Sequence, residues 1–99
     1  MNEIIENYQN PDFSVEEVAI RYGISSVHLR RLFHEVYRES PKRLLLSFRT
    51  GRAREMLHET DSPISEIAER CGFGSAYYFS KVMRERTGMT PSEIRRKLK

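Results

Sequence analysis

The segment "GISSVHLRRLFHEV", residues 23–36, decides the fold. Interpreted as a helix that begins near Ser26, it predicts two faces of different character, because residues spaced i, i+3, i+4 and i+7 share one side of a helix. The face expected to pack in a core carries Leu29, Leu32, Phe33 and Val36. The opposite face is short and basic, and it carries Val27, Arg30, Arg31 and His34.

The same pattern occurs twice in the chain. The segment "VAIRYGIS" (18–25) is similar to "IAERCGFG" (67–74), at an offset of 49 residues. After one extra residue in the second copy, "LRRLFHEVYRESP" (29–41) is similar to "FSKVMRERTGMTP" (79–91), at an offset of 50. The chain therefore contains two copies of one structural unit.

Each copy satisfies the constraints of a helix-turn-helix, in which two short helices cross closely. The crossing requires a small residue, which is Ala19 or Ala68, and the turn four residues later requires positive φ, which glycine adopts at no steric cost. The remaining matched positions are the turn glycines Gly23 and Gly72, the apolar residues Ile24 and Phe73, and the second-helix residues Leu29, Leu32, Phe79 and Val82. A single match to this pattern is typical of any αα-hairpin, but two matches in 99 residues indicate the helix-turn-helix.

Helix start signals and apolar spacing predict an all-α fold with seven helices, at 2–9, 15–22, 26–37, 42–58, 63–71, 76–87 and 91–98. We expect one domain over 1–99, with helix-turn-helix units at about 14–38 and 62–87, a connecting helix at about 41–58 and a C-terminal helix at about 91–98. The start signals are the capping boxes Ser14–Glu17 and Thr90–Glu93 and the pairs Ser40-Pro41 and Ser62-Pro63. In the first helix one face carries Met1, Ile4, Ile5 and Tyr8, which predicts that this helix packs.

The charge distribution favours an anionic partner. Net charge is only +3, but residues 1–20 hold five acidic residues and no Lys or Arg. Residues 21–99 hold all 17 basic residues against nine acidic ones, a surplus of eight. No apolar run approaches the roughly 20 residues of a membrane span, and the N-terminus lacks the pattern of a signal peptide. With Cys71 as the one cysteine, an internal disulfide is impossible, so we expect a cytoplasmic protein.

The outward faces of the two second helices predict contact with duplex DNA. Arg and Lys side chains donate to guanine O6 and N7, and apolar side chains contact the thymine methyl group. The repeat matches the first face to Tyr77, Ser80, Lys81 and Arg84, with Ala76 just before them. A connecting helix of about 25 Å, together with the helix widths, would separate two recognition helices by about 34 Å, one turn of DNA. We expect backbone contacts from Ser26, His34, Lys42, Arg49, Ser75 and Arg84.

Other functions have less support. His28 and His34 are six residues apart and do not share a helix face, and Cys71 occupies a core position, so no metal site or cofactor is expected. The chain has no nucleophile–base pair, phosphate loop or dinucleotide motif, so no enzyme is expected. By the repeat, Phe79 is in the core, Tyr78 is intermediate and only Tyr77 faces outward, which is too few aromatic side chains for a platform that stacks unpaired bases. The alternative is a helical protein-interaction module with only non-specific affinity for DNA.

The chain resembles the DNA-binding domain of the AraC/XylS family of bacterial transcription regulators over essentially its whole length. The segments that carry the resemblance are "SPKRLLLSFRTGRAREML" (40–57) and "ISEIAERCGFGSAYYFSKVMRERTGMTPSEIRR" (64–96). The resemblance implies a seven-helix domain that binds promoter DNA and activates transcription through RNA polymerase, without a small-molecule site in this chain. It implies base contacts from Val27, Arg30, Arg31, Ala76, Tyr77, Ser80 and Lys81.

The chain departs from the family pattern in the connecting helix, where the family has an apolar residue after Arg49. Here Thr50 and Gly51 follow, and a glycine inside a helix costs about 1 kcal/mol relative to alanine. We therefore expect a looser connecting helix. Ala76 is short where the family often has longer polar side chains, so the second unit should read fewer bases by hydrogen bonds. The sequence fits either a C-terminal domain of a longer regulator or a small self-contained one.

Overall fold

The computed structural model describes residues 2–98, which contain seven α-helices and no strand. The helices are α1 (Asn2–Asn7), α2 (Val15–Tyr22), α3 (Ser26–Tyr37), α4 (Pro41–Glu59), α5 (Ile64–Arg70), α6 (Ala76–Thr87) and α7 (Pro91–Leu98). Every boundary lies within two residues of the predicted one. The all-α prediction with two helix-turn-helix units and a long connecting helix is therefore confirmed.

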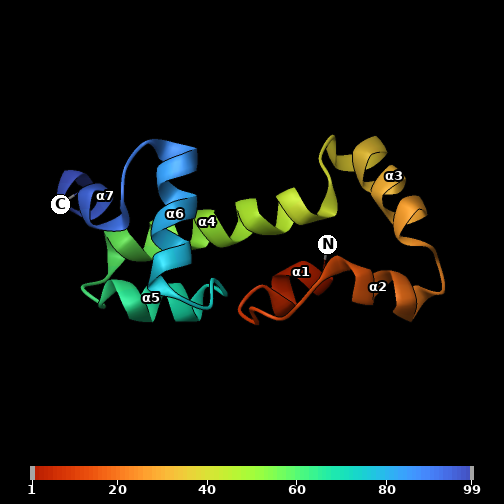
Figure 1. Cartoon of the computed structure of the whole chain (residues 1–99), viewed down its shortest axis with the longest axis horizontal. Helices are drawn as coiled ribbons and strands as arrows, with labels where there is room; N and C mark the ends of the chain where they lie inside the picture. The colour runs from red at the N-terminus through yellow and green to blue at the C-terminus, as the bar shows by residue number, and fades with distance from the viewer. Residues whose placement is uncertain (1, 99) are drawn as a thin grey trace.

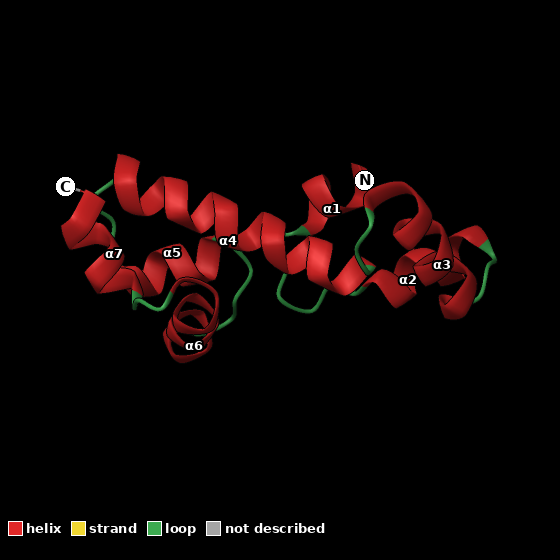
Figure 2. Cartoon of the chain, turned by 90° about the horizontal axis from the view of Figure 1, so that it is seen from above, coloured by secondary structure: helices red, strands yellow, loops and turns green. Residues whose placement is uncertain are grey.

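Helix α4 spans the molecule and carries one helix-turn-helix unit at each end (Figures 1 and 2). The molecule is elongated, with extents of 44 × 22 × 21 Å. Each unit has its own hydrophobic core. The first core contains Ile4, Phe13, Val18, Ala19, Leu29 and Leu45. The second contains Ala53, Met56, Leu57, Ile67, Ala68, Cys71, Phe73, Phe79, Val82, Met83 and Ile94.

The internal repeat is visible in the backbone of the two turns. The Ile24 N–H donates to the Ala19 carbonyl at 3.0 Å, and the Phe73 N–H donates to the Ala68 carbonyl at 2.9 Å. These are the 6→1 hydrogen bonds of a Schellman turn, which requires a left-handed residue after the helix. Gly23 and Gly72 supply it, with φ of 69° and 83°. Ala19 and Ala68 are buried at the crossings, as the sequence predicts.

The two recognition helices, α3 and α6, begin and end at matched positions. Ser25 Oγ accepts a hydrogen bond from the His28 N–H, and Ser75 Oγ accepts one from the Tyr78 N–H, each at 3.1 Å. These N-caps satisfy backbone donors that the first turn of a helix leaves free. At the C-terminal ends the left-handed residue is Arg38 in α3 and Gly88 in α6. The recognition helices are therefore held in the same local geometry.

Helix α4 runs without interruption through Gly51, the residue at which the sequence predicts a looser helix. Its 19 residues correspond to about 28 Å. Gly51 is exposed and a Cβ there would meet no atom within 4 Å, which means that no packing contact requires the glycine. At its C-terminal end, Arg95 of α7 donates to the carbonyl oxygens of Leu57 and Thr60, at 3.4 and 3.3 Å. These bonds satisfy carbonyl groups at the end of the helix.

In α3 and α1, fewer residues of the predicted apolar face are buried than their helical spacing indicates. Val36 is 68% exposed and Leu32 is 39% exposed, because the neighbours of α3 cover only the side that carries Leu29 and Phe33. In the second unit Val82, the match of Leu32, is buried. In α1, Ile4 is buried but Ile5 is 49% exposed, and Met1 lies outside the described residues.

Two of the four predicted caps are also wrong. Ser14 precedes α2 but makes no side-chain cap hydrogen bond, and the Glu17 N–H donates to its carbonyl instead. Pro63 takes the N-cap position of α5, where no side chain caps the helix. Ser40 does cap α4, accepting a hydrogen bond from the Arg43 N–H. The Thr90–Glu93 capping box also forms, with reciprocal hydrogen bonds between each side chain and the other residue's N–H.

Candidate nucleic-acid interface

The outward face of α3 carries the predicted side chains into solvent. Val27 is 60% exposed, and Arg30, Arg31 and His34 are exposed beside it. Arg30 Nε donates to the Ser26 carbonyl at 3.4 Å, a long hydrogen bond that a better acceptor can replace. The face combines one apolar side chain near the start of the helix with cationic donors further along. This chemistry suits the edges of base pairs in the major groove.

The matched face of α6 is built in the same order but with different side chains. Tyr77 is 82% exposed, Lys81, Arg84 and Ser75 are exposed, and Ala76 and Ser80 are half-buried. Two ion pairs between described side chains lie on α4 and α5, where Arg52 pairs with Glu55 and Arg70 with Glu66. Neither pair includes a side chain of α3 or α6.

The two faces belong to units at opposite ends of α4. Figure 1 shows α3 beyond one end of α4 and α6 against the other half. Successive major-groove segments on one face of B-DNA are about 34 Å apart. The long dimension of the whole molecule, measured end to end, is 44 Å and exceeds that separation. Single helix-turn-helix proteins reach two such segments by forming dimers.

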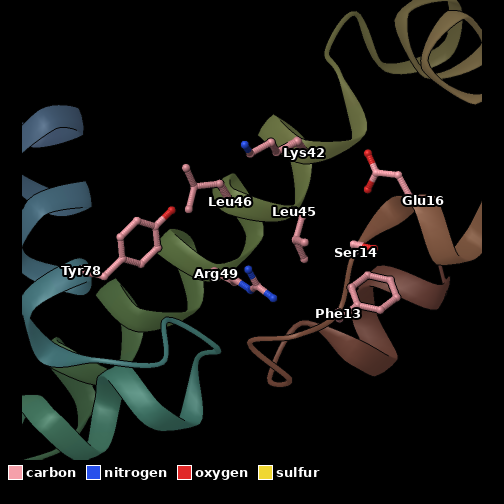
Figure 3. Close-up of a pocket in the computed structure, with 8 residues that line it drawn as sticks. All are labelled: Phe13, Ser14, Glu16, Lys42, Leu45, Leu46, Arg49 and Tyr78. Carbon is pink, nitrogen blue, oxygen red and sulfur yellow. The ribbon is translucent and has the colours of Figure 1, made fainter. Parts of the chain in front are cut away.

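A groove of about 290 Å³ separates the two units (Figure 3). Tyr78 of α6 forms one wall, and Phe13, Ser14 and Glu16 form the other. Lys42, Leu45, Leu46 and Arg49 line it from α4. Tyr78 is 41% exposed, about half as much as Tyr77, so it is somewhat more exposed than the intermediate position that the repeat predicts. Lys42 is exposed beside the groove, where a cation is accessible to a backbone phosphate.

Arg49 is expected to contact the DNA backbone, but the structure places it inside the protein. It is only 8% exposed, and its guanidinium donates to the carbonyl oxygens of Tyr8 and Asn10, each at 2.8 Å. Burial lowers the pKa of Arg49 from its ordinary value, although the nearby Tyr78 opposes this shift. The sequence held a signal for this burial, because Arg49 is four residues from both Leu45 and Ala53 and so shares their buried face. Its guanidinium therefore makes its hydrogen bonds within the protein.

Three features of the described residues bear on the alternatives considered above. Among them no group of three or more His, Cys, Asp or Glu side chains could hold a metal ion. No described helix is long and apolar enough to cross a membrane. Cys71 is fully buried next to Met56, with the two sulfur atoms 3.7 Å apart, and burial raises the pKa of its thiol to about 11. Cys71 is therefore a core residue, as predicted.

Comparison with known proteins identifies the family. A family model described as a helix-turn-helix domain matches residues 18–97. The HTH-type transcriptional regulator GbdR of Pseudomonas aeruginosa is 38% identical over 89 residues, which are 90% of this chain and 24% of that protein. The HTH-type transcriptional activator RhaS of Enterobacter sp. (strain 638) is 34% identical over 91 residues, 92% of this chain and 33% of that protein. The chain thus spans between a quarter and a third of the length of these relatives.

Solved structures show the same fold. The C-terminal domain of AraT, a response regulator from Geobacillus stearothermophilus, has a TM-score of 0.91 at 33% identity, covering 97% of this chain and 79% of that one. An AraC-type regulator from Chromobacterium violaceum has a TM-score of 0.78 at 30% identity, covering 98% and 89%. The DNA-binding domain of AdpA, solved in complex with a target DNA, has a TM-score of 0.86 at 27% identity, covering 97% and 89%. These matches cover nearly the whole chain, which therefore belongs to the AraC family of helix-turn-helix transcription regulators and has the fold of that family's DNA-binding domain.

Proposed function

We propose that this domain binds double-stranded promoter DNA with sequence preference and thereby regulates transcription. Helices α3 and α6 enter two successive major-groove segments on one face of the duplex. The observation that carries this proposal is the pair of matched, exposed and cationic faces on α3 and α6, at opposite ends of α4. The relative AdpA, whose DNA-binding domain has this fold, was solved with a target DNA, which supports the same class of partner.

The two helices read different sequences, because their base-contacting side chains differ at each matched position. In α3, Arg30 and Arg31 donate to base edges and Val27 contacts a thymine methyl group. In α6, Lys81 supplies the one cationic donor, Tyr77 and Ala76 supply apolar contacts, and Ser80 supplies a hydroxyl. A bidentate Arg–guanine pair discriminates by about 1–3 kcal/mol against other bases. We therefore expect stronger hydrogen-bond readout from α3 than from α6.

The DNA backbone is held by side chains that flank these faces. Ser26 and Ser75 lie at the N-terminal ends of the recognition helices, where backbone N–H groups and the helix dipole favour a phosphate. His34 and Arg84 follow one turn beyond Arg30 and Ser80, and Lys42 lies beside the groove between the units. Each cationic contact adds to affinity for every sequence, since phosphates carry no base information. Arg49 is not among these contacts, because its guanidinium binds Tyr8 and Asn10.

We also propose the cellular setting that this function requires. A transcription regulator acts in the cytoplasm of a bacterium, on promoter DNA, together with RNA polymerase. The relative RhaS is described as a transcriptional activator, which favours activation over repression for this chain. Contact with RNA polymerase would use a surface that the DNA leaves free.

Two substitutions on α6 test the division between base and backbone contacts. Lys81→Ala should relax preference at one position of the site, at a cost of about 1–3 kcal/mol for the preferred base. Arg84→Ala, the matched control one turn away, should weaken all sequences about equally and reduce the slope of log K against log salt by roughly 0.9. Fluorescence anisotropy with single-base variants of the site, over a salt series, measures both. If Lys81→Ala weakened every sequence equally, Lys81 would be a backbone contact and the assignment would be wrong.

A further inference from the structure

The loop between α1 and α2 belongs to the first unit but lies against the second. On the first side, the ring of Tyr8 packs edge-on against Phe48, with centroids 4.9 Å apart, and Phe13 is buried in the first core. On the second side, Pro11 lies 3.5 Å from the point where a Cβ of Gly74 would stand. Figure 1 shows this loop meeting the α5–α6 turn. The loop is therefore a contact between the two units besides α4.

Arg49 attaches this loop to α4. Its Nε donates to the Tyr8 carbonyl and its terminal NH₂ donates to the Asn10 carbonyl, both at 2.8 Å. Hydrogen bonds from a cation are stronger than neutral ones, and the guanidinium is rigid and planar, so two acceptors fix its orientation. Because Arg49 lies near the middle of α4, between the residues that join the first and second cores, the loop is held at the boundary of the two units.

Gly72, in the turn of the second unit, lies against the Tyr8 carbonyl group that Arg49 also binds. A Cβ at Gly72 would collide with the Tyr8 carbonyl oxygen and would approach Arg49 Nε. Gly23 occupies the matched turn of the first unit with a similar positive φ, yet a Cβ there would meet nothing within 4 Å. A helix-turn-helix turn therefore does not need the close approach seen at Gly72. The close approach at Gly72 is instead a contact between the second unit and the first.

We propose that Tyr8, Asn10, Arg49 and Gly72 form an inter-unit brace that fixes the orientation of α6 relative to α3 and so sets the half-site spacing that the domain accepts. The inference rests on the proposed function in its use of two half-sites. The two cores are separate, so without the brace α4 would be the main connection between them. One inserted base pair shifts a half-site by about 3.4 Å and rotates it by about 34°. A braced protein cannot follow that rotation, whereas one hinged on α4 can.

The test uses Arg49→Met, which keeps the length of the side chain and removes its donors, and Arg49→Lys, which retains a cation. Binding is measured by anisotropy on the selected site, on the same site with one base pair added or removed, and on each half-site. For the unmodified protein we expect a loss of tenfold or more on either spacer change. For Arg49→Met we expect the loss to fall to about threefold or less, with half-site affinities unchanged. For Arg49→Lys the loss of affinity on a spacer change should lie between the losses of the unmodified protein and of Arg49→Met.

Glycine substitutions supply a matched pair. Gly72→Ala and Gly23→Ala both place a β-carbon at positive φ, but only the first collides with the Tyr8 carbonyl. Gly72→Ala should weaken spacing discrimination, and Gly23→Ala should leave it unchanged in the folded protein. Helical circular dichroism confirms that each variant folds. If Arg49→Met does not fold, Arg49→Lys and the glycine pair still decide the proposal.

Residual dipolar couplings test the brace without DNA. In the unmodified protein one alignment tensor should fit the amides of both units, and in Arg49→Met the two units should require different tensors. A single tensor and an unchanged spacer penalty in Arg49→Met and Gly72→Ala would overturn the proposal. If the unmodified protein showed no preference for a two-part site, the proposed function would fail, while the couplings would still decide whether the brace exists.

Discussion

The two recognition helices end in the same left-handed conformation but with different residues. This difference predicts that Arg38→Gly changes the stability of the domain. Arg38 ends α3 with φ of 61°, and Gly88 ends α6 with φ of 80°. A left-handed conformation costs a residue with a Cβ roughly 1–2 kcal/mol. Glycine avoids this cost but loses about 0.5–1 kcal/mol more backbone entropy on folding. Arg38→Gly should therefore stabilise the domain by about 0.5–1 kcal/mol, which raises Tm by roughly 2–8 °C at this chain length.

The control is Arg38→Ala, which removes the charged side chain but keeps the β-carbon, and it should give no comparable gain. Gly88→Ala should lower stability by a similar amount, because a Cβ there meets no atom within 4 Å and only the backbone strain changes. Thermal unfolding followed by circular dichroism, without DNA, measures all three variants. Equal stability of Arg38→Gly and Arg38→Ala, or a neutral Gly88→Ala, would refute the reasoning.

Three further predictions concern the helices and the core. Gly51→Ala should stabilise the domain by about 1 kcal/mol in urea unfolding, because Gly51 is exposed within α4 and has open space around it; a loss of stability would contradict this. Cys71 should react with a thiol reagent at pH 8 only at the rate of unfolding, because it is buried and its pKa is raised to about 11; fast labelling of the native protein would refute its burial. Hydrogen bonds from Thr90 lower the pKa of Glu93, so its stabilisation is present above its ordinary pKa of 4.5 and is lost as pH falls through the lowered native value. Glu93→Gln should flatten the pH dependence of Tm in that acidic range, and an unchanged profile would count against the capping box.

Most of the architecture could be predicted because a helix-turn-helix constrains specific residue types. The small residues Ala19 and Ala68 and the glycines Gly23 and Gly72 are required by local geometry, so they are visible in the sequence and appear twice. The positions of the two outward faces follow from the helical period once the start of each recognition helix is fixed by its serine cap. Local constraints of this kind transfer directly from sequence to structure.

The structure differs from the sequence-based expectation where a residue's environment depends on distant parts of the chain. Arg49 is expected to contact the DNA backbone, but the partners of its guanidinium are carbonyl groups 41 and 39 residues earlier in the chain, which periodicity does not identify. Val36 fits an apolar face, yet no neighbour covers it. Its match in the second unit is Arg86, which donates to Ser47 Oγ at 3.1 Å. That polar match was the available signal that the position faces outward.

The central claim is that one chain reads two major-groove segments, one with each recognition helix. Selection of bound duplexes from a random library by the purified protein, at near-physiological salt, tests it most directly. We predict two enriched blocks about one helical turn apart. One enriched block would contradict readout by both helices. Absence of enrichment, with binding lost as salt rises, would contradict sequence preference altogether and favour a protein-interaction module with a non-specific affinity for DNA.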